Sequence, residues 1–358
     1  MHRTTWIELS SEALRHNASV VRQLAPNAAI LAMVKANGYG HGAHWVAEQL
    51  KQHVNGFAVA RISEARVLRD AMPTSPLLLL GTLVDKDLLL TCAGLELDIV
   101  IHDIASAKLL ANTPLPKPIS VWLKMNIGMN RLGLSAAEFR EAHLLLSGKP
   151  HISSILHMSH FSDAEDIDAR LTQQQSQKLR TLSLELGNSP ISMANSAAII
   201  SHPESHLDWV RPGIMLYGDD PTQRLSNELA LKPVMTFKAK IIATREVAKD
   251  EGVGYNHRWR ASGSARIATV AAGYADGYPR HAPDGTPVLV NGQRASVAGR
   301  VSMDLMTIDV SHLPATAIGD EVTLWGEGLP AAEVGEHCGT ISYELFTRIT
   351  ARVSRFYC

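Results

Sequence analysis

The run AILAMVK at residues 29–35 is apolar until its final lysine, and it indicates how the chain folds. A strand that is apolar on both faces is typical of a parallel sheet that helices cover on both sides. Seven further runs of this kind follow, and helix-compatible stretches such as 63–72 and 135–147 separate most of them. The further runs occupy residues 56–60, 76–80, 97–102, 119–125, 153–159, 190–194 and 209–215.

Eight apolar strands that alternate with helices predict an α/β fold with a TIM-type (β/α)8 barrel, for which roughly 250 residues or slightly fewer suffice. A helical pattern at 10–24 precedes the first of these strands. An open doubly wound sheet is the alternative, but no G-x-G-x-x-G turn follows the first strand. We therefore assign residues 1–231 to a barrel domain.

The pattern of predicted elements changes near Pro233, where short strand-like segments replace the alternation of strands and helices. Gly-Asp, Asn-Gly and Asp-Gly pairs separate these segments, and Asn291-Gly292 between two of them is a hairpin signal. We therefore assign residues 232–358 to a mainly β domain. Its expected strands are 235–245, 266–272, 287–290, 296–299, 304–310 and 321–325.

The composition narrows the classes of function. Hydrophobic residues make up 46% and charged residues 19% of the 358 residues, which is typical of a globular chain of about two domains. Lys plus Arg (34) and Asp plus Glu (35) nearly balance, so no basic excess indicates nucleic acid or an anionic membrane as a partner. No apolar run of signal-peptide type opens the sequence, and the three cysteines suggest no disulfide set. We expect a cytoplasmic protein.

Residues that carry chemistry in such a barrel lie at the carboxyl ends of the strands. Lys35 ends the first strand, and the loop ANGYGHG at 36–42 has three glycines that let a ligand approach the backbone. Each polar strand-end residue alone has an ordinary interpretation, such as a solvated lysine or a surface ion pair. Their convergence on one rim indicates an anion-binding site with a lysine suited to imine formation. The later strands end at or near Arg131, His160, Asn195, Ser196, Arg211, Gly213 and Ile214.

The segment AMVKANGYGHG at 32–42 resembles the lysine motif of alanine racemases, which use pyridoxal 5'-phosphate (PLP). The lysine motif alone would be shared with single-domain PLP-binding barrels. Further segments match in order over nearly the whole chain, which makes the resemblance specific. These segments are GMNRLG (128–133), HF (160–161), NSA (195–197), RPGIMLYG (211–218), GVGY (252–255), GYADGY (273–278), GRVSMD (299–304) and ISYE (341–344).

The resemblance implies an isomerase that interconverts L-alanine and D-alanine, with a barrel and a β domain in a head-to-tail homodimer. Lys35 would hold PLP as an aldimine and serve as one base. Tyr255 from the other subunit would be the second base, because a proton must leave one face of Cα and return to the opposite face. The residues implied to bind the cofactor are Lys35, Tyr39, His160, Asn195, Ser196, Arg211, Gly213, Ile214 and Tyr343.

The resemblance also implies more specific roles. Arg211 would face the pyridine nitrogen, and His160 would pack beside the ring and orient Arg211. Because a guanidinium only donates hydrogen bonds, the pyridine nitrogen would stay unprotonated. Arg131 would contact the phenolic oxygen of PLP and the substrate carboxylate. The backbone at Met303 of the partner subunit would help to hold this carboxylate, and Tyr274 would line the path to the site.

Lys124, upstream of Arg131, stands where some family members carry a carbamylated lysine. A carbamate would turn a cation beside Arg131 into an anion that orients it. The alternative is an ordinary lysine on a buried strand, which is costly unless it is paired. The chain also departs from the family at Asn126-Ile127, where Asp-Thr or Asp-Ser is frequent. This change removes a carboxylate near Arg131.

The histidines 151, 157 and 160 are dense enough to suggest a metal site, but strand alternation puts the first two on one side and the third on the other. We therefore expect no metal. Other functions stay open: a serine or broad-specificity racemase, or a non-catalytic PLP-binding homeostasis protein, which would not need Tyr255. A PLP decarboxylase would normally place a carboxylate, not Arg211, at the ring nitrogen. The sequence also leaves open whether D-alanine is made or degraded.

Overall fold

A computed structural model describes residues 4–83, 85–166, 170–222 and 229–358 of the chain. Eight parallel strands close into a barrel in which each strand pairs with the next and the last pairs with the first. Each of the eight apolar runs overlaps one of these strands, so the predicted TIM-type barrel is confirmed. The strands are β2 (Ala29–Met33), β3 (Gly56–Val59), β4 (Leu77–Leu79), β5 (Asp98–Ile101), β6 (Ile119–Lys124), β7 (Ile152–Met158), β8 (Ile191–Ser192) and β9 (Trp209–Val210).

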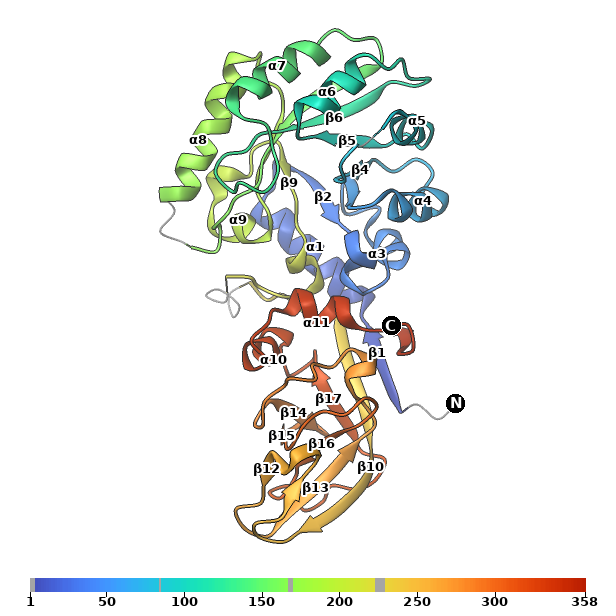
Figure 1. Ribbon diagram of the computed structural model, residues 1–358, viewed down its shortest axis with the longest axis vertical. Coiled ribbons are helices and arrows are strands. Elements are labelled where there is room, and N and C mark those ends of the chain that lie inside the picture. Colours follow the sequence, from blue (N-terminus) through green and yellow to red (C-terminus); the bar gives the residue numbers. More distant parts are fainter. Residues whose placement is uncertain (1–3, 84, 167–169, 223–228) are drawn as a thin grey trace. The chain divides into compact units, whose positions relative to one another are not determined.

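Helices surround the barrel strands (Figure 1). Local capping fixes several of their starts: Asp85, Asp103 and Ser135 each accept a hydrogen bond from the third residue beyond. The elements are α1 (Ser11–Leu24), α2 (Lys35–Tyr39), α3 (Ala43–Leu50), α4 (Ile62–Ala71), α5 (Lys86–Gly94), α6 (Ile104–Ala111), α7 (Ala136–Leu146), α8 (Arg170–Glu185), α9 (Ser196–Ser201), η1 (Pro203–Ser205) and η2 (Ile214–Tyr217).

The C-terminal part, from residue 235 on, is mainly β, as predicted. Its large sheet has the strand order β13-β16-β15-β14-β17-β10-β1-β18, and β11 and β12 form a separate pair. Its elements are β10 (Met235–Val247), β11 (Gly252–Val253), η3 (Tyr255–His257), β12 (Trp259–Arg260), β13 (Ala265–Val270), η4 (Tyr274–Asp276), β14 (Pro287–Val290), β15 (Gln293–Val297), β16 (Met306–Asp309), β17 (Glu321–Trp325), α10 (Ala331–His337), α11 (Ser342–Arg348) and β18 (Ser354–Tyr357).

The hairpin between β14 and β15 has the predicted turn. Val290 pairs with Gln293, and the two residues between them have φ values of 47° (Asn291) and 80° (Gly292). Positive φ at both central positions is what a two-residue hairpin loop of this type requires, and Asn-Gly tolerates it. The strand after the turn therefore begins at Gln293, earlier than the expected 296–299.

The N-terminal strand β1 (Thr5–Leu9) lies in the sheet of the second unit, although we assigned residues 1–231 to the barrel. It pairs antiparallel with β10 and parallel with β18. Contacts accordingly divide the chain into one unit formed by 14–216 with 220–231 and another formed by the remaining described residues. Strand pairing between residues so distant in the chain has no local signal, which is why the pattern at 1–13 does not reveal its partner.

The barrel strands end earlier than the predicted runs, and at two of them this changes where a site residue lies. Lys35 was expected to end the first barrel strand and Arg211 to lie within the eighth, but β2 ends at Met33 and β9 ends at Val210. Pro212 has no N–H to donate, so the ladder of β9 cannot continue far beyond Arg211. Lys35 instead begins α2, because the residues after it adopt a backbone conformation incompatible with a strand.

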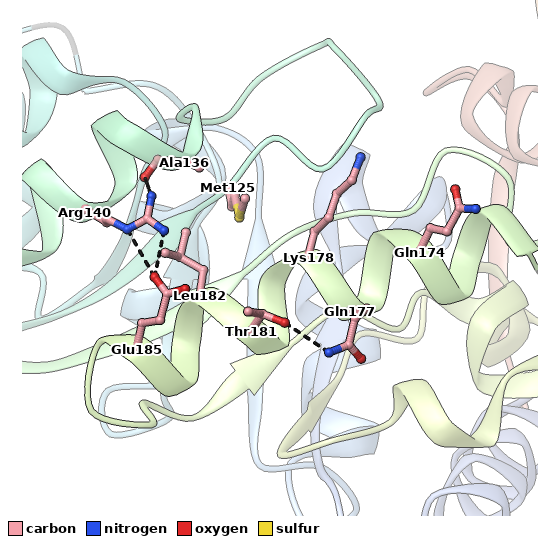
Figure 2. A pocket seen from close by; sticks show the side chains of 9 residues that line it. All are labelled: Met125, Ala136, Arg140, Gln174, Gln177, Lys178, Thr181, Leu182 and Glu185. Carbon is pink, nitrogen blue, oxygen red and sulfur yellow. Dashed lines mark hydrogen bonds and ion pairs between the residues drawn. The ribbon is translucent and has the colours of Figure 1, made fainter.

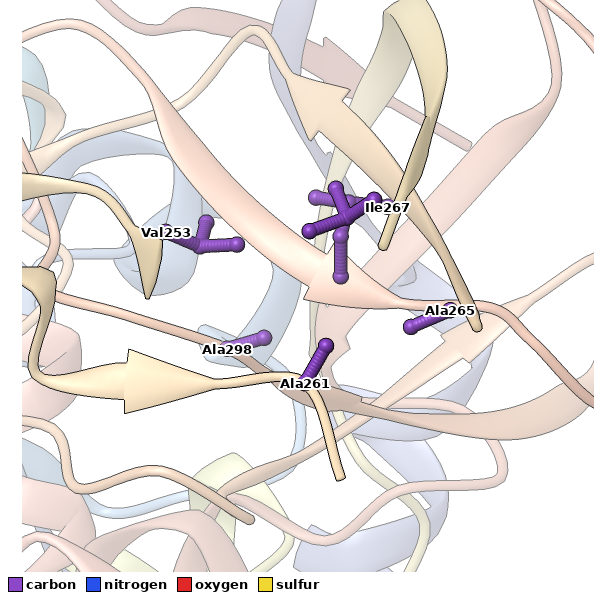
Figure 3. Packing of buried hydrophobic residues seen from close by; sticks show 6 residues of the cluster. Val253, Ala261, Ala265, Ile267 and Ala298 are labelled. Atoms are coloured by element: carbon purple, nitrogen blue, oxygen red, sulfur yellow. The ribbon is translucent and has the colours of Figure 1, made fainter. Parts of the chain in front are cut away.

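A small apolar cluster in the C-terminal unit anchors the β11–β12 pair, and Figure 3 shows its members converging. Val253 on β11 packs there, two residues before Tyr255. The turn that carries Tyr255 therefore projects from a packed base. The buried members of the cluster are Val247, Val253, Ala261, Ala265, Ile267 and Ala298, with Trp259 packed against them.

His157 on β7 is a hydrogen-bonded core histidine. Its Nδ1 lies 2.8 Å from the Ser183 Oγ, and its Nε2 lies 3.0 Å from the His143 Nδ1. The Ser183 hydroxyl donates to the Ser189 carbonyl (3.2 Å), so it accepts from the His157 ring, whose Nε2 is then an acceptor for His143. Burial and the neighbouring His143 lower the pKa of His157 to about 4. The ring is therefore neutral at physiological pH.

This neutral histidine predicts a loss of stability in mild acid. Between pH ~6.5 and ~4 the unfolded chain takes up a proton that the folded site excludes, so the free energy of unfolding should fall by on the order of 2–3 kcal/mol across this range. Urea titrations at a series of pH values measure the slope. His157→Gln should be less stable near neutrality but show a flatter slope, whereas His53→Gln, at an exposed position, should keep the steep one. Equal slopes for all three proteins would contradict the assignment.

Candidate active site

Lys35 begins a left-handed turn at the rim of the barrel. The next four residues all have φ values between 52° and 62°: Ala36, Asn37, Gly38 and Tyr39. For residues other than glycine this region costs roughly 1–2 kcal/mol each. Hydrogen bonds offset the strain, because Gly40 N–H donates to Ala36 O (3.0 Å) and Ala43 N–H donates to the Asn37 side chain (3.0 Å). The three glycines of the loop therefore explain only part of its conformation.

Tyr39, Ser196 and Gly213 meet beside this turn. A Cβ atom at position 213 would lie 2.6 Å from the Tyr39 Oη, so only glycine leaves room for the tyrosine. The Ser196 hydroxyl accepts from Gly213 N–H (2.9 Å) and from Met215 N–H (3.4 Å). Asn195 caps α9 by accepting from Ala198 N–H (3.0 Å). These contacts bring a hydroxyl, a phenol and the start of a helix together from three separate segments.

Arg211 is buried and all of its described hydrogen-bond partners are neutral. Its guanidinium donates to the Ser192 hydroxyl (2.6 Å) and to the carbonyls of Ser159 (2.5 Å) and Met193 (3.1 Å). Nη2 also lies 3.3 Å from the His160 Nδ1. Burial lowers the pKa of Arg211 to about 10, and burial together with the nearby cations lowers that of His160 to about 3. His160 is therefore a neutral ring that accepts from a charged guanidinium.

Lys35, Lys124, Arg131 and Arg211 form a cation cluster. Burial is the main reason that the pKa of Lys124 falls to about 8, with the charges of Arg211, Arg131 and Lys35 adding to it. Burial also lowers the pKa of Lys35, followed by Arg131 and Arg211, while Glu64 opposes the shift. Such a concentration of positive charge favours an anionic ligand. Carbamylation of Lys124 stays a prediction; the lowered pKa increases the share of neutral amine, the form that reacts with CO2.

Asn126 organises the loop that carries Arg131, which is the point where the chain departs from the family pattern. Its side-chain oxygen accepts from Gly128 N–H (3.0 Å) and Asn130 N–H (3.1 Å), and its Nδ2 donates to the Asn130 side chain (2.9 Å). An amide can make all three contacts because it both donates and accepts. The replacement therefore removes a negative charge while the loop stays hydrogen-bonded.

Three of the C-terminal residues implied by the resemblance line one pocket. Tyr255 on η3, Tyr274 on η4 and Met303 border a cavity of about 300 Å³. Arg280 and Arg300 also line it, and the sequence reasoning did not single them out, although Arg300 lies inside a matching motif. Tyr255 is 66% exposed and Met303 54%. Tyr343 lies on α11 and is partly buried; it is not among the residues that line this pocket.

Arg352 holds the two loops that carry Tyr274 and Met303. Its Nε donates to Asp276 (2.7 Å) and its Nη2 lies 2.8 Å from an Asp304 carboxylate oxygen. Asp276 is only 5% exposed in its side chain and also accepts from Gly273 N–H (2.8 Å). The loops are further joined by backbone hydrogen bonds, including Ala275 N–H to Met303 O (2.9 Å). The sequence reasoning missed Arg352, whose partners are far from it in the chain.

A second hollow, of about 580 Å³, lies between α7 and α8 on the barrel unit. Arg140 closes one end through an ion pair with Glu185 (2.7 Å), as Figure 2 shows. None of the residues predicted for the site lines it. Within the described part of the chain, no group of three or more His, Cys, Asp or Glu side chains is arranged to hold a metal ion. No helix among the described residues is long and apolar enough to cross a membrane.

Comparison with known proteins agrees with this geometry. The family model for the N-terminal domain of alanine racemase matches residues 9–221, and that for the C-terminal domain matches 234–357. An alanine racemase from Stutzerimonas stutzeri (strain A1501) is 46% identical over 346 residues, which cover 96% of each chain. The crystal structure of the biosynthetic alanine racemase from Pseudomonas aeruginosa covers 100% of both chains, with a TM-score of 0.96 and 44% identity. The alanine racemase structure from Acinetobacter baumannii gives a TM-score of 0.93 at 35% identity, with 100% of both chains covered.

A closed barrel with a lysine among cations at its rim is typical of a barrel enzyme and suits an anionic ligand. The two domain matches and the full-length relatives are more specific. The chain belongs to the alanine racemase family of isomerases, which confirms the resemblance found in its motifs.

The contacts of Arg352 predict that it restrains the loops beside Tyr274 and Met303. Arg352→Met should speed amide hydrogen exchange at Tyr274 and Ala275, because the buried Asp276 loses its cationic partner, and should cost about 1–3 kcal/mol of stability. Exchange mass spectrometry measures the effect. Arg348→Met removes a pair with Glu344 in which both side chains are 46% exposed, and should leave these amides unchanged. Unchanged exchange in Arg352→Met would mean that the backbone bonds alone hold the loops.

Proposed function

We propose that the chain is a PLP-dependent alanine racemase that interconverts L-alanine and D-alanine, with Lys35 and Tyr255 as its two bases. The observation that carries the proposal is the cation cluster around Lys35. Burial, followed by the charges of Arg131 and Arg211, lowers the pKa of this amine. A lysine must lose its proton to act as a nucleophile or base, so this environment suits the role.

The donor set suits a phosphorylated cofactor. The hydroxyls of Tyr39 and Ser196 and the amides of Gly213 and Ile214, near the start of α9, are groups that bind a phosphate. Asn195 holds the start of this helix, and Tyr343 of α11 is part of the proposed set. The absent Cβ at Gly213, which leaves room for the Tyr39 Oη, supports the fit. When bound, PLP supplies the electron sink that makes the Cα proton of an amino acid removable.

Lys35 would hold the cofactor covalently and move a proton at one face of the substrate Cα. Arg211, fixed by neutral acceptors and by His160, would donate a hydrogen bond to the ring nitrogen of the cofactor. The Arg211 guanidinium keeps its own proton, so the ring nitrogen of the cofactor would stay unprotonated. Arg211 would thereby limit electron withdrawal into the ring and disfavour side reactions such as transamination. Arg131 would bind the substrate carboxylate together with the backbone at Met303 of the partner subunit.

Tyr255 would move the proton at the opposite face, as a residue of the partner subunit. Its 66% exposure and its position on a turn with strained neighbours support this part of the proposal. Gly254, Asn256 and His257 have φ values of 71°, 61° and 46°. Arg258 holds the turn by donating to the carbonyls of Ala282 (2.8 Å) and Gly299 (3.1 Å). A fixed, solvent-facing tyrosine suits a site completed by a second copy of the chain.

A cytoplasmic location is also part of the proposal. All three cysteines, Cys92, Cys338 and Cys358, are free thiols. Free thiols suit a reducing compartment.

The assignment of Lys35 predicts where PLP is attached. Purified protein should be yellow, and borohydride should fix the cofactor to a peptide that contains Lys35, because reduction traps the lysine that holds it. Lys35→Ala should lose both colour and label. Lys178→Ala, which removes an exposed lysine of the α8 hollow, should retain both. Tandem mass spectrometry locates the label, and its appearance on a peptide without Lys35 would overturn the assignment.

The proposed sharing of the site between subunits predicts complementation. Lys35→Ala and Tyr255→Phe homodimers should each racemise alanine poorly. Mixing them under conditions that exchange subunits should give heterodimers in which one site carries both lesions and the other carries none. Activity should return to about half of wild type per heterodimer, from the symmetry of a two-fold dimer. Lack of recovery after verified exchange would mean that both bases come from one chain or that Tyr255 is not the second base.

A further inference from the structure

We propose that Glu64 is a positioning residue for Lys35: its carboxylate fastens the left-handed turn after Lys35 to the start of α4, and its charge partly offsets the cation cluster. This inference deepens the proposed function, and its catalytic consequence rests on the role proposed there for Lys35. Its structural content concerns only residues of the barrel unit.

The carboxylate of Glu64 accepts three backbone hydrogen bonds from two different segments. Oε1 accepts from Ala36 N–H (2.6 Å), which belongs to the peptide group joining Lys35 to Ala36. Oε2 accepts from Ala60 N–H (2.9 Å) and Arg61 N–H (3.0 Å), at the junction of β3 and α4. Hydrogen bonds to an ionised carboxylate are stronger than those between neutral groups. Glu64 therefore ties the turn that carries Lys35 to the neighbouring strand–helix connection.

The turn needs such a fastening because of its backbone strain. Ala36, Asn37 and Tyr39 hold left-handed conformations without being glycine. Strained residues of this kind persist only when the surroundings hold them in place. Ala36 is the first of the three, and the short hydrogen bond to Glu64 restrains it at the point where the chain leaves Lys35. Loss of this bond should loosen the turn at its first residue.

The charge of Glu64 acts on Lys35 as well. Among the described residues, the charged or titratable groups that influence the Lys35 amine, or are influenced by it, are Glu64 on α4, Lys124 on β6, Arg131, His160 and Arg211. Glu64 is the one carboxylate among them, and it raises the pKa of Lys35 against the cations and burial. Removal of this charge should therefore lower the pKa of Lys35 further and shift its titration toward acid.

Glu138 supplies a matched control. Like Glu64, it stands three residues after a helix N-cap and accepts a backbone hydrogen bond there, from Ser135 N–H (2.9 Å). It lies on α7 and has no described interaction with Lys35. Glu138→Gln therefore removes a capping carboxylate without altering the surroundings of Lys35, so effects specific to Glu64→Gln cannot come from helix capping alone.

The test titrates Lys35 in cofactor-free protein, prepared by removing PLP with hydroxylamine. Competitive acetylation with acetic anhydride across a pH series, read by mass spectrometry, gives the midpoint of the Lys35 amine. Glu64→Gln should lower this midpoint by on the order of one pH unit and speed amide hydrogen exchange at Ala36. Glu138→Gln should change neither. Glu64→Asp, which keeps the charge on a shorter side chain, should hold the midpoint near the wild-type value while Ala36 exchanges faster.

Each outcome bears on a different claim. An unchanged Lys35 midpoint and unchanged Ala36 exchange in folded Glu64→Gln overturn the inference. If Glu64→Gln does not fold, a wild-type midpoint with faster Ala36 exchange in Glu64→Asp supports the inference, and wild-type Ala36 exchange overturns it. Because no cofactor is present, the titration does not depend on racemisation. A shifted midpoint in a protein that never racemises alanine would support the positioning role and contradict the proposed function.

Discussion

The pairing of β2 with β9 closes the barrel, and the candidate site depends on that closure. Ala29 pairs with Trp209 and Ile30 with Val210, so the chain that continues into Lys35 runs beside the chain that continues into Arg211. Parallel strands deliver their carboxyl ends to one rim. Lys124 at the end of β6 and Arg131 in the loop beyond it join the same cluster. Residues from opposite ends of the barrel sequence thereby come within range of each other's charge.

That proximity has an energetic cost. Like charges in partly buried surroundings destabilise one another, and here Arg131 and Arg211 add to burial in lowering the pKa of Lys35 and of Lys124. In the part of the chain that the structure describes, Arg211 is hydrogen-bonded to neutral oxygens and to the neutral His160, and no carboxylate pairs with its charge. An anionic ligand would offset this cost and so stabilise the folded state by binding to it. The arrangement that lowers stability is thus the same one that would suit the proposed lysine and anion site.

In the C-terminal unit, hydrogen bonds hold solvent-facing groups in fixed positions. Tyr255, Tyr274 and Met303 are well exposed, yet their loops are not free. Arg258 spans the Tyr255 turn and the strand connections around Gly299, while Arg352 spans the loops of Tyr274 and Met303. A guanidinium presents several donors in a rigid fork, so one side chain can tie several loops together. The small cluster around Val253 and Ile267 gives the β11–β12 pair a packed base (Figure 3).

The sequence by itself determined the approximate positions of the eight barrel strands, the mainly β character of the C-terminal domain and the Asn-Gly hairpin. It could do so because apolar runs and turn residues act locally, and each of these features is specified by neighbours in the chain. It also placed the polar residues at one rim, since that follows from parallel strands alone. Only the tertiary structure decided that β1 joins the second sheet, that Glu64 and Arg352 hold loops near predicted site residues, and that His157 is part of a buried hydrogen-bonded chain. It likewise decided the left-handed backbone at Ala36, Asn37 and Tyr39, because residues with a Cβ hold that conformation only when their surroundings stabilise it, here through hydrogen bonds within the loop and one from Ala36 N–H to the distant Glu64.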